Sequence, residues 1–422
     1  MKDEWFHSSF ILPKGAPMQR SKSALVLAGG GVAGAAYEIG ALCAIDQILE
    51  QHSVNEFDSY VGTSAGALVG SCLANNISPR TLLSVLDSPA FGIDQLEPQH
   101  LFSLNLPAAL ARIRHLPAAL GTITRNLLTG QGVSLFDLAE RLAPSLPSGL
   151  YDANALEGYL RAALELPGRT NRFSRLNHEL AIIATDLDTG ERAIFGHPPL
   201  EDVAISQAVS ASAAIPFFYR PVRIDDRDYI DGGIRGTVSL DVAIEGGAEL
   251  IVCINPMVPF DNSHHLPGHA ISDEGVPQIG SQVFRTFIHA GLHYHIKQIR
   301  RRHPEVDIIL IEPSRDDHVM FHDSTMRYQT RLTIARHAFE TVATQLTQHF
   351  SRYSELLGRH GIMISDRQLC QDLIDLKDLG DDFGAMRSIM MGDGALSRTP
   401  AGLAHTLAEL DRLLGRIEGS GA

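Results

Sequence analysis

The stretch from Ser23 to Gly34 reads SALVLAGGGVAG and decides the predicted fold. Its first six residues are small or apolar and carry no charge, which predicts a short, fully buried strand. The strand runs into the glycines of residues 29–34, and the pattern resumes as a helix from about Ala35 to Glu50. A strand that passes through a glycine turn into a helix is typical of α/β proteins.

A second unit of the same kind follows. Residues 57–62 predict a strand that enters the turn Thr63-Ser64-Ala65-Gly66 and leaves as an apolar helix from Ala67 to Leu73. Further strands are predicted at 179–185, 191–195, 250–254 and 306–311, and a helix near 203–214. The alternation predicts a three-layer α/β/α fold with a central, mostly parallel sheet.

Composition limits the function classes. The 422 residues contain 35 Lys and Arg against 49 Asp and Glu, so the formal net charge is −14. That balance excludes nucleic-acid binding and broad adhesion to anionic lipid as uses of the whole surface. The four cysteines lie far apart, and no apolar run is long enough for a signal-peptide core or a membrane span. We therefore expect a cytoplasmic protein, and any contact that it makes with a membrane would be local and peripheral.

Changes in sequence character suggest how the chain is divided. Residues 1–22 form a lead-in, residues 23–345 the main α/β domain, and residues 346–422 a helical C-terminal extension. The apolar, locally basic segment at about 101–130 predicts a helical insertion in the main domain. It would serve either as a lid that contacts lipid or as a helical cover of the sheet.

Two glycine motifs point to different chemistries. Gly29-x-Gly31-x-x-Gly34 matches the dinucleotide-binding fingerprint, but the next strand ends in Val61-Gly62 without the acid that would hold a ribose. Gly62-Thr63-Ser64-Ala65-Gly66 is a G-x-S-x-G motif on a predicted strand-to-helix turn, where glycines allow a bend that exposes a serine. Ser64 is therefore a candidate nucleophile.

A nucleophilic serine needs a base. None of the 19 histidines lies in a recognisable setting, whereas Asp231 stands out in the sequence Tyr-Ile-Asp-Gly-Gly of residues 229–233. Asp-Gly is also the commonest hairpin dipeptide, so the residues alone leave a catalytic and a turn role equally open.

Taken in order, four motifs resemble those of the patatin-like phospholipases. They are Gly29–Gly34, Gly62–Gly66, Ala211–Pro216 and Asp231–Gly233, and the segment Ala184–Gly190 is also similar. The resemblance covers about residues 23–255 and continues more weakly to about 345.

This resemblance implies a lipid acyl hydrolase, of phospholipase A or esterase type, that acts through an acyl-serine intermediate. Ser64 would be the nucleophile and Asp231 the base of a Ser–Asp dyad, and the amides of Gly29, Gly30 and Gly31 would form the oxyanion hole. The substrate would be a lipid or another acyl ester, and neither a cofactor nor a metal ion would be required. The family usually has Arg or Lys where this chain has Ala33, which favours neutral esters over phospholipids.

Two alternatives from other classes stay open. One is a Ser–His–Asp esterase of the α/β-hydrolase type, and the other is a non-catalytic lipid- or nucleotide-binding protein that uses the Gly29–Gly34 loop. Two further features are expected to be structural: the aromatic run Phe217–Tyr219 as core, and the basic cluster around Arg300–Arg302 as a solvated helix face.

Overall fold

The computed structural model describes residues 20–105, 147–235, 238–263, 270–322, 326–378 and 383–390. The predicted insertion lies outside the described residues from position 106 onward, as do residues 1–19 of the lead-in and 391–422 of the extension.

A sheet of eight strands forms the centre of the molecule, in the order β12-β11-β1-β3-β6-β10-β9, with β7 also paired to β6. The five strands from β12 to β6 are parallel, and β7, β9 and β10 pair antiparallel. The prediction of a central, mostly parallel sheet is confirmed. The strands are β1 (Ser23–Leu27), β3 (Ser59–Thr63), β6 (Glu179–Asp186), β7 (Arg192–Phe195), β9 (Val222–Ile224), β10 (Arg227–Asp231), β11 (Leu250–Ile254) and β12 (Asp307–Ile311).

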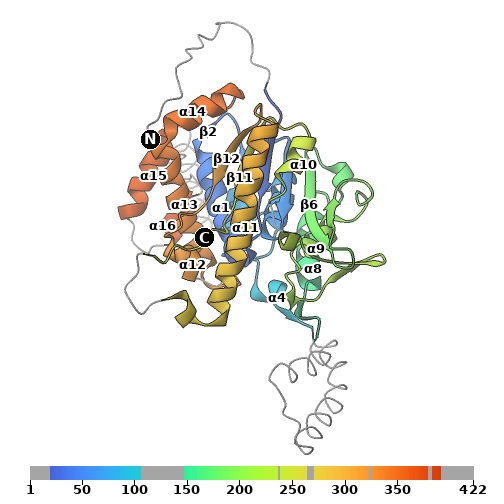
Figure 1. The fold of residues 1–422 in the computed structure, drawn as a ribbon. Coiled ribbons are helices and arrows are strands. Elements are labelled where there is room, and N and C mark those ends of the chain that lie inside the picture. The colour runs from blue at the N-terminus through green and yellow to red at the C-terminus, as the bar shows by residue number, and fades with distance from the viewer. Residues whose placement is uncertain are drawn as a thin grey trace, which may run out of the picture.

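Helices cover both faces of this sheet (Figure 1). Along β1, Leu25 and Leu27 belong to one apolar cluster, and Ala24 and Val26 belong to the other, as the alternation of a strand requires. The first cluster includes α1 (Gly31–Ile48), α2 (Ala65–Ala74) and α13 (Arg331–Gln348), and the second includes α10 (Leu240–Glu245) and α11 (Val276–Arg302). The three-layer architecture is therefore confirmed.

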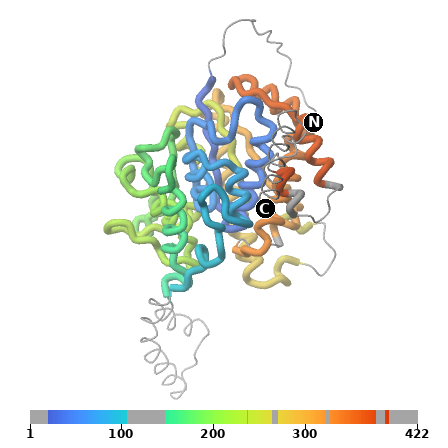
Figure 2. Tube along the Cα trace, turned by 180° about the vertical axis from the view of Figure 1, so that it is seen from behind, coloured from blue at the N-terminus to red at the C-terminus, as the bar shows by residue number. Residues whose placement is uncertain are grey.

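The described part of the C-terminal segment packs beside the first helix (Figure 2). The strand β13 (Met363–Ile364) pairs with β2 (Leu49–Glu50), and the Gln47 side chain donates hydrogen bonds to the carbonyls of Ile389 and Met390. The helices of this segment are α14 (Phe350–Arg359), α15 (Arg367–Asp378) and α16 (Phe383–Met390). The domain boundaries themselves stay predictions.

A small sheet of β4 (Ser103–Leu104), β5 (Gly149–Asp152) and β8 (Phe217–Tyr219) lies beside the main one. No helix in the described ranges has the length and apolar character needed to cross a bilayer. The remaining helices are α3 (Pro79–Val85), α4 (Pro98–Leu101), α8 (Asn154–Leu164), α9 (Ile205–Ser212) and α12 (His318–His322), with 3-10 turns η1 (Val54–Glu56), η3 (Phe173–Arg175), η4 (Gly232–Arg235) and η5 (Ile271–Glu274).

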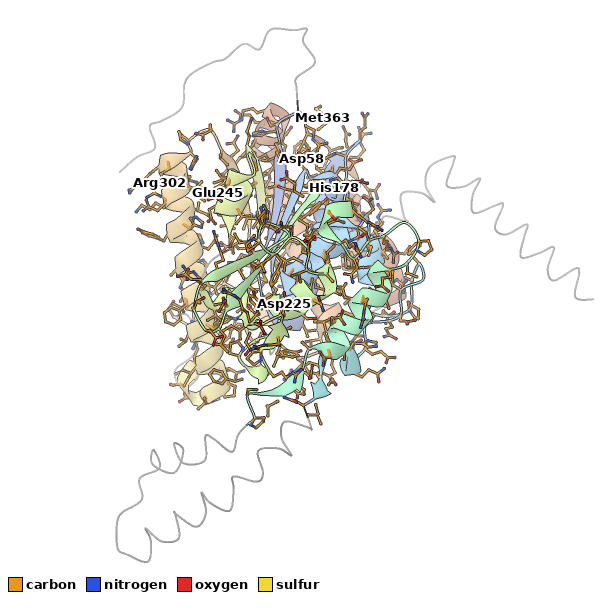
Figure 3. The ribbon with its side chains drawn as sticks, turned by 90° about the vertical axis from the view of Figure 1, so that its right-hand side faces the viewer. Asp58, His178, Asp225, Glu245, Arg302 and Met363 are labelled. Atoms are coloured by element: carbon orange, nitrogen blue, oxygen red, sulfur yellow. The ribbon has the colours of Figure 1, made fainter. Side chains whose placement is uncertain are left out.

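The basic cluster lies at the amino edge of the sheet. Asp58, which precedes β3, and Arg302, which ends α11, lie at the same end of the molecule, away from Asp225 (Figure 3). Arg300, Arg301 and Arg302 are exposed in the last turn of α11, where cations are stabilised by the helix dipole. As the sequence predicts, these residues form a solvated helix face.

Candidate active site

Ser64 occupies a strained turn between β3 and α2. Its backbone has φ 55° and ψ −118°, a conformation that L-residues rarely adopt and that costs about 1–3 kcal/mol. The turn is tight enough that a Cβ on Gly62 would lie 2.4 Å from the carbonyl oxygen of Gly66. A side chain at position 62 would therefore open the turn that presents Ser64.

One buried side chain holds this turn in place. The Ser212 hydroxyl, at the end of α9, accepts a hydrogen bond from the Ser64 amide at 2.8 Å and donates one to the carbonyl of Ile183. Ser212 is 0% exposed, so its hydroxyl provides the buried Ser64 amide with the hydrogen-bond acceptor that water would provide at the surface. The sequence placed Ser212 in a motif but assigned it no role, because its partners lie far away along the chain.

The central strand β6 brings Asp231 next to the serine. Thr63, at the end of β3, is opposite Ile183 of β6, and Asp231, at the end of β10, is opposite the following residue, Ala184. The Ser64 hydroxyl lies close enough to the Asp231 carboxylate to lower its pKa as a hydrogen-bond donor. The two residues thus meet through strand pairing although they lie far apart in the sequence.

The carboxylate of Asp231 is buried and poorly solvated. Burial raises its pKa to about 6, while hydrogen bonds from the Ser64 hydroxyl and the Gly233 amide, the latter at 2.7 Å, act in the opposite direction. A carboxylate with this pKa is a stronger base than an exposed aspartate and is still ionised at neutral pH.

The glycine loop faces the serine from the neighbouring strand. A Cβ on Gly29 would lie 3.1 Å from the Ser64 Cβ, and α1 begins at Gly31, directly after this loop. Amides at the start of a helix have no acceptor within that helix, and they favour negative charge. The loop of Gly29, Gly30 and Gly31 therefore lies beside Ser64 and leads into the start of a helix.

An apolar cavity of about 60 Å³ opens onto Ser64. Its walls are mostly aliphatic, and the residues that line it come from segments far apart in the sequence, from α1 to the start of α13. The described lining residues are Gly31, Val32, Ala35, Ser64, Ala65, Leu68, Leu86, Leu96, Leu101, Leu156, Ala213, Ile215, Tyr219, Met326, Tyr328 and Arg331.

The aromatic run after α9 differs from the prediction. Tyr219 is buried and lines the cavity, but Phe217 is 87% exposed and Phe218 is 44% exposed. The expectation that all three are core residues is wrong for the two phenylalanines. They enter the small sheet at β8, which places them on the surface of the protein.

All five residues singled out from the sequence thus lie together: Ser64, Asp231 and the amides of the three glycines. Among the described residues that line the cavity, none is a histidine. The cavity wall itself could not be read from the sequence, because its leucines belong to helices that meet only in the folded chain.

Comparison with solved structures finds distant similarity. VipD from Legionella pneumophila is 13% identical, with 93% of this chain and 87% of that chain covered and a TM-score of 0.29. ExoU in its heterodimeric complex with SpcU, from the type III secretion system of Pseudomonas aeruginosa, is 18% identical, with 93% and 70% covered and a TM-score of 0.24. With TM-scores this low, the similarities carry no conclusion about this chain.

Comparison with sequences is more informative. A protein described as probable lipid hydrolase 463L, from Invertebrate iridescent virus 6, is 21% identical over 227 residues, which are 52% of this chain and 63% of that protein. The model of the patatin-like phospholipase family matches residues 25–244, just over half of the chain, from within β1 to within α10. The chain belongs to the patatin-like phospholipase family.

Proposed function

We propose that the protein is a lipid acyl hydrolase that cleaves carboxylic esters with a Ser64–Asp231 dyad. The observation that carries the proposal is that strands paired to β6 bring Ser64, in a strained turn beside a glycine loop, next to the buried carboxylate of Asp231. Family membership supports the same class of reaction.

The reaction follows from these positions. Ser64 Oγ attacks the ester carbonyl while Asp231 takes its proton, and the amides of residues 29–31 stabilise the oxyanion. Asp231 then gives the proton to the leaving alcohol, which leaves an acyl-serine. Water attacks the acyl group in the second half, again with Asp231 as the base, and the carboxylic acid and free Ser64 are released.

The cavity indicates the kind of substrate. Its aliphatic walls suit an acyl chain, and its volume of about 60 Å³ means that the walls must move apart to admit a long one. The one charged residue among its described lining residues, Arg331, donates hydrogen bonds to the carbonyls of Leu86 and Tyr328 and stacks on the Tyr328 ring. Ala33 is buried in α1. We therefore propose that neutral esters are preferred over anionic phospholipids.

Local contact with a lipid surface is part of the proposal. The small sheet that borders the cavity exposes Leu104 at 60%, Leu150 at 56% and Phe217 at 87%. Exposed apolar side chains close to the mouth of a lipid-binding cavity favour binding at a bilayer surface. The cytoplasmic location stays a prediction.

Hydrolysis of p-nitrophenyl esters of graded acyl length tests the proposed function, with mixed phospholipid vesicles and a neutral acylglycerol emulsion as parallel substrates. We expect turnover with an optimum chain length, and faster turnover of the neutral lipid. An absence of turnover with every ester, in the presence and absence of vesicles, contradicts the proposal.

Replacing Ser212 by alanine tests how the nucleophile is held. The Ser64 amide would lose its buried acceptor, which costs about 1–3 kcal/mol of unfolding free energy, and a small shift of Ser64 is expected to lower kcat by about 10- to 100-fold with little change in KM. Ser210→Ala is the matched control, because the Ser210 hydroxyl lies on the same helix, equally buried and without a hydrogen-bond partner among the described residues. Equal losses in the two variants would mean that Ser212 does not position Ser64.

The pH dependence tests the base. The pKa of Asp231 is raised to about 6, so its basic form is lost as the pH falls through 6, and kcat/KM is expected to fall tenfold per pH unit below that value. The measurement is kcat/KM between pH 4.5 and 8.5 at constant ionic strength. A kcat/KM that stays constant down to pH 4.5, or a fall below pH 6 that is abolished by substituting a histidine, contradicts Asp231 as the base.

A further inference from the structure

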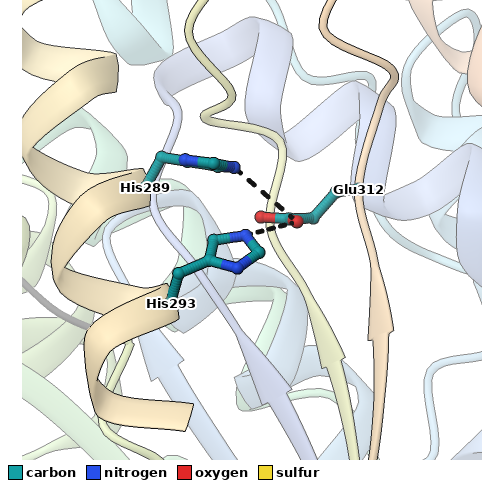
Figure 4. A group of neighbouring side chains, drawn as sticks. All are labelled: His289, His293 and Glu312. Atoms are coloured by element: carbon teal, nitrogen blue, oxygen red, sulfur yellow. Dashed lines mark hydrogen bonds and ion pairs between the residues drawn. The ribbon is translucent and has the colours of Figure 1, made fainter. Parts of the chain in front are cut away.

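Three side chains that the hydrolytic chemistry does not use converge beside β12, the strand that ends the parallel part of the sheet. His289 and His293 lie one turn apart on α11, and Glu312 follows the last residue of β12. One ligand atom from each of these residues lies within 4.8 Å of the other two. Figure 4 shows both imidazole rings directed from the helix toward the carboxylate.

The distances leave room for a metal ion between them. Nε2 of His293 lies 3.0 Å and Nε2 of His289 lies 4.0 Å from the same oxygen of Glu312, Oε2. Nitrogen and oxygen ligands about 2.0–2.2 Å from a tetrahedral Zn²⁺ ion are about 3.4 Å apart, which falls between these two values. A hydrogen bond to Glu312 would explain the position of His293 alone. It would not explain why the Nε2 atoms of both histidines are directed toward the same oxygen, Oε2.

The carboxylate is itself held by a buried neighbour. Asn255, which directly follows β11 and is 0% exposed, donates a hydrogen bond from Nδ2 to the other oxygen, Oε1, at 2.7 Å. Metal-binding carboxylates characteristically have such an outer partner, which fixes the orientation of the free oxygen. Glu312 is thereby directed toward the two histidines.

We propose that His289, His293 and Glu312 bind a divalent transition-metal ion, with Zn²⁺ as the best match. Two imidazoles and one carboxylate are the ligands of open zinc sites, whereas Ca²⁺ and Mg²⁺ take oxygen ligands. The His293 side chain is 47% exposed, so a fourth position would open to solvent.

The site is separate from the candidate active site but lies at the same edge of the sheet. Glu312 follows β12 and Ser64 follows β3, and the strands β11 and β1 lie between them in register. At about 4.8 Å per strand, the two positions are roughly 14 Å apart. The ion is therefore no part of the dyad chemistry.

The test measures metal content, not hydrolysis, so its result is independent of the proposed function. Full-length protein is stripped with EDTA and dialysed against buffered Zn²⁺, and its zinc content is determined. In parallel, Co²⁺ is titrated and its visible spectrum recorded. We expect one ion per chain and the absorption bands of low-coordinate Co²⁺.

Variants assign the ligands. The double variant His289→Ala/His293→Ala is expected to lose the ion. Glu312→Gln is expected to weaken Zn²⁺ binding by more than about 100-fold, because loss of a residue that only hydrogen-bonds to a metal ligand typically costs about 10- to 100-fold. His303→Ala is the matched control, because His303 forms an exposed pair with Glu305 at the end of the same helix.

Equal zinc content in the wild type and the double variant, or an equal loss in His303→Ala, overturns the proposal. The Co²⁺ bands are expected from the wild-type protein, so this part of the test does not depend on whether a variant folds. Their absence from the wild type also overturns the proposal.

Discussion

Replacing Ser64 with alanine is expected to lower kcat/KM for ester hydrolysis by at least about 10⁴-fold. The reason is that the proposed reaction forms a covalent bond to Ser64 Oγ, and Ser64 is the hydroxyl that lies beside the Asp231 carboxylate. The measurement is hydrolysis of the best p-nitrophenyl ester by wild type and variant at pH 8. The variant should retain its fold, because alanine at position 64 removes only a hydroxyl from an otherwise unchanged turn.

Ser71→Ala is the matched control for this result. Ser71 is 0% exposed on α2, seven residues beyond Ser64, and its hydroxyl donates a hydrogen bond to the carbonyl of Leu68. This variant should hydrolyse esters at close to the wild-type rate. If Ser64→Ala keeps wild-type activity while folded, the nucleophile is elsewhere in the chain.

The second large effect is expected from Asp231→Asn, which should act on activity and stability in opposite directions. Asparagine cannot accept the serine proton, so kcat should fall by about 10³- to 10⁴-fold. The same change removes a buried charge, so the variant should be more stable to unfolding at pH 7 than the wild type.

The sign of the stability effect follows from the pKa. The pKa of Asp231 is about 6 in the folded state and 3.8 in its ordinary state, so between these values the folded protein holds the proton more tightly. Stability therefore falls as the pH rises from about 4 to 6, and the full penalty, up to about 3 kcal/mol, is present above pH 6. The gain from Asp231→Asn should be present at pH 7 and largely absent at pH 4.

Urea unfolding at pH 7 and pH 4 measures this difference, with Asp58→Asn as the control. Asp58 accepts hydrogen bonds from the amide and hydroxyl of Ser23 at the amino edge of the sheet, away from the site. The control should keep its activity and gain no stability. An Asp231→Asn variant that is less stable at pH 7 and equally active would contradict both the burial argument and the role of Asp231 as base.

Local pattern was enough to predict the elements that hold the catalytic candidates. The buried strands and their glycine turns can be predicted from the sequence, because a short uncharged apolar run that ends in glycines is typical of a buried strand followed by a tight turn. The expected start of the first helix, Ala35, was late: α1 begins at Gly31, since its first turn is built from the glycine loop itself.

What the sequence could not give depends on contacts between distant segments. Ser212 supports Ser64 only because α9 returns to the end of β6, and Met326, Tyr328 and Arg331 reach the cavity from beyond residue 320. The exposure of Phe217 is decided by its place in a small sheet, which no local pattern shows.

The same holds for the proposed metal site. The spacing of His289 and His293 is visible as a one-turn repeat on a helix, and it could have suggested a pair of ligands. Their third partner, Glu312, is identified only when β12 is placed beside β11.

Mapping the site of covalent labelling tests the central claim most directly. Wild type, Ser64→Ala and Asp231→Asn are treated at pH 8 with a long-chain fluorophosphonate, which phosphonylates activated serines, and the labelled peptide is identified by mass spectrometry. The account predicts a single adduct on Ser64, none in Ser64→Ala and strongly slowed labelling in Asp231→Asn. Labelling of a different residue, or ester hydrolysis that continues without any adduct on Ser64, would contradict it.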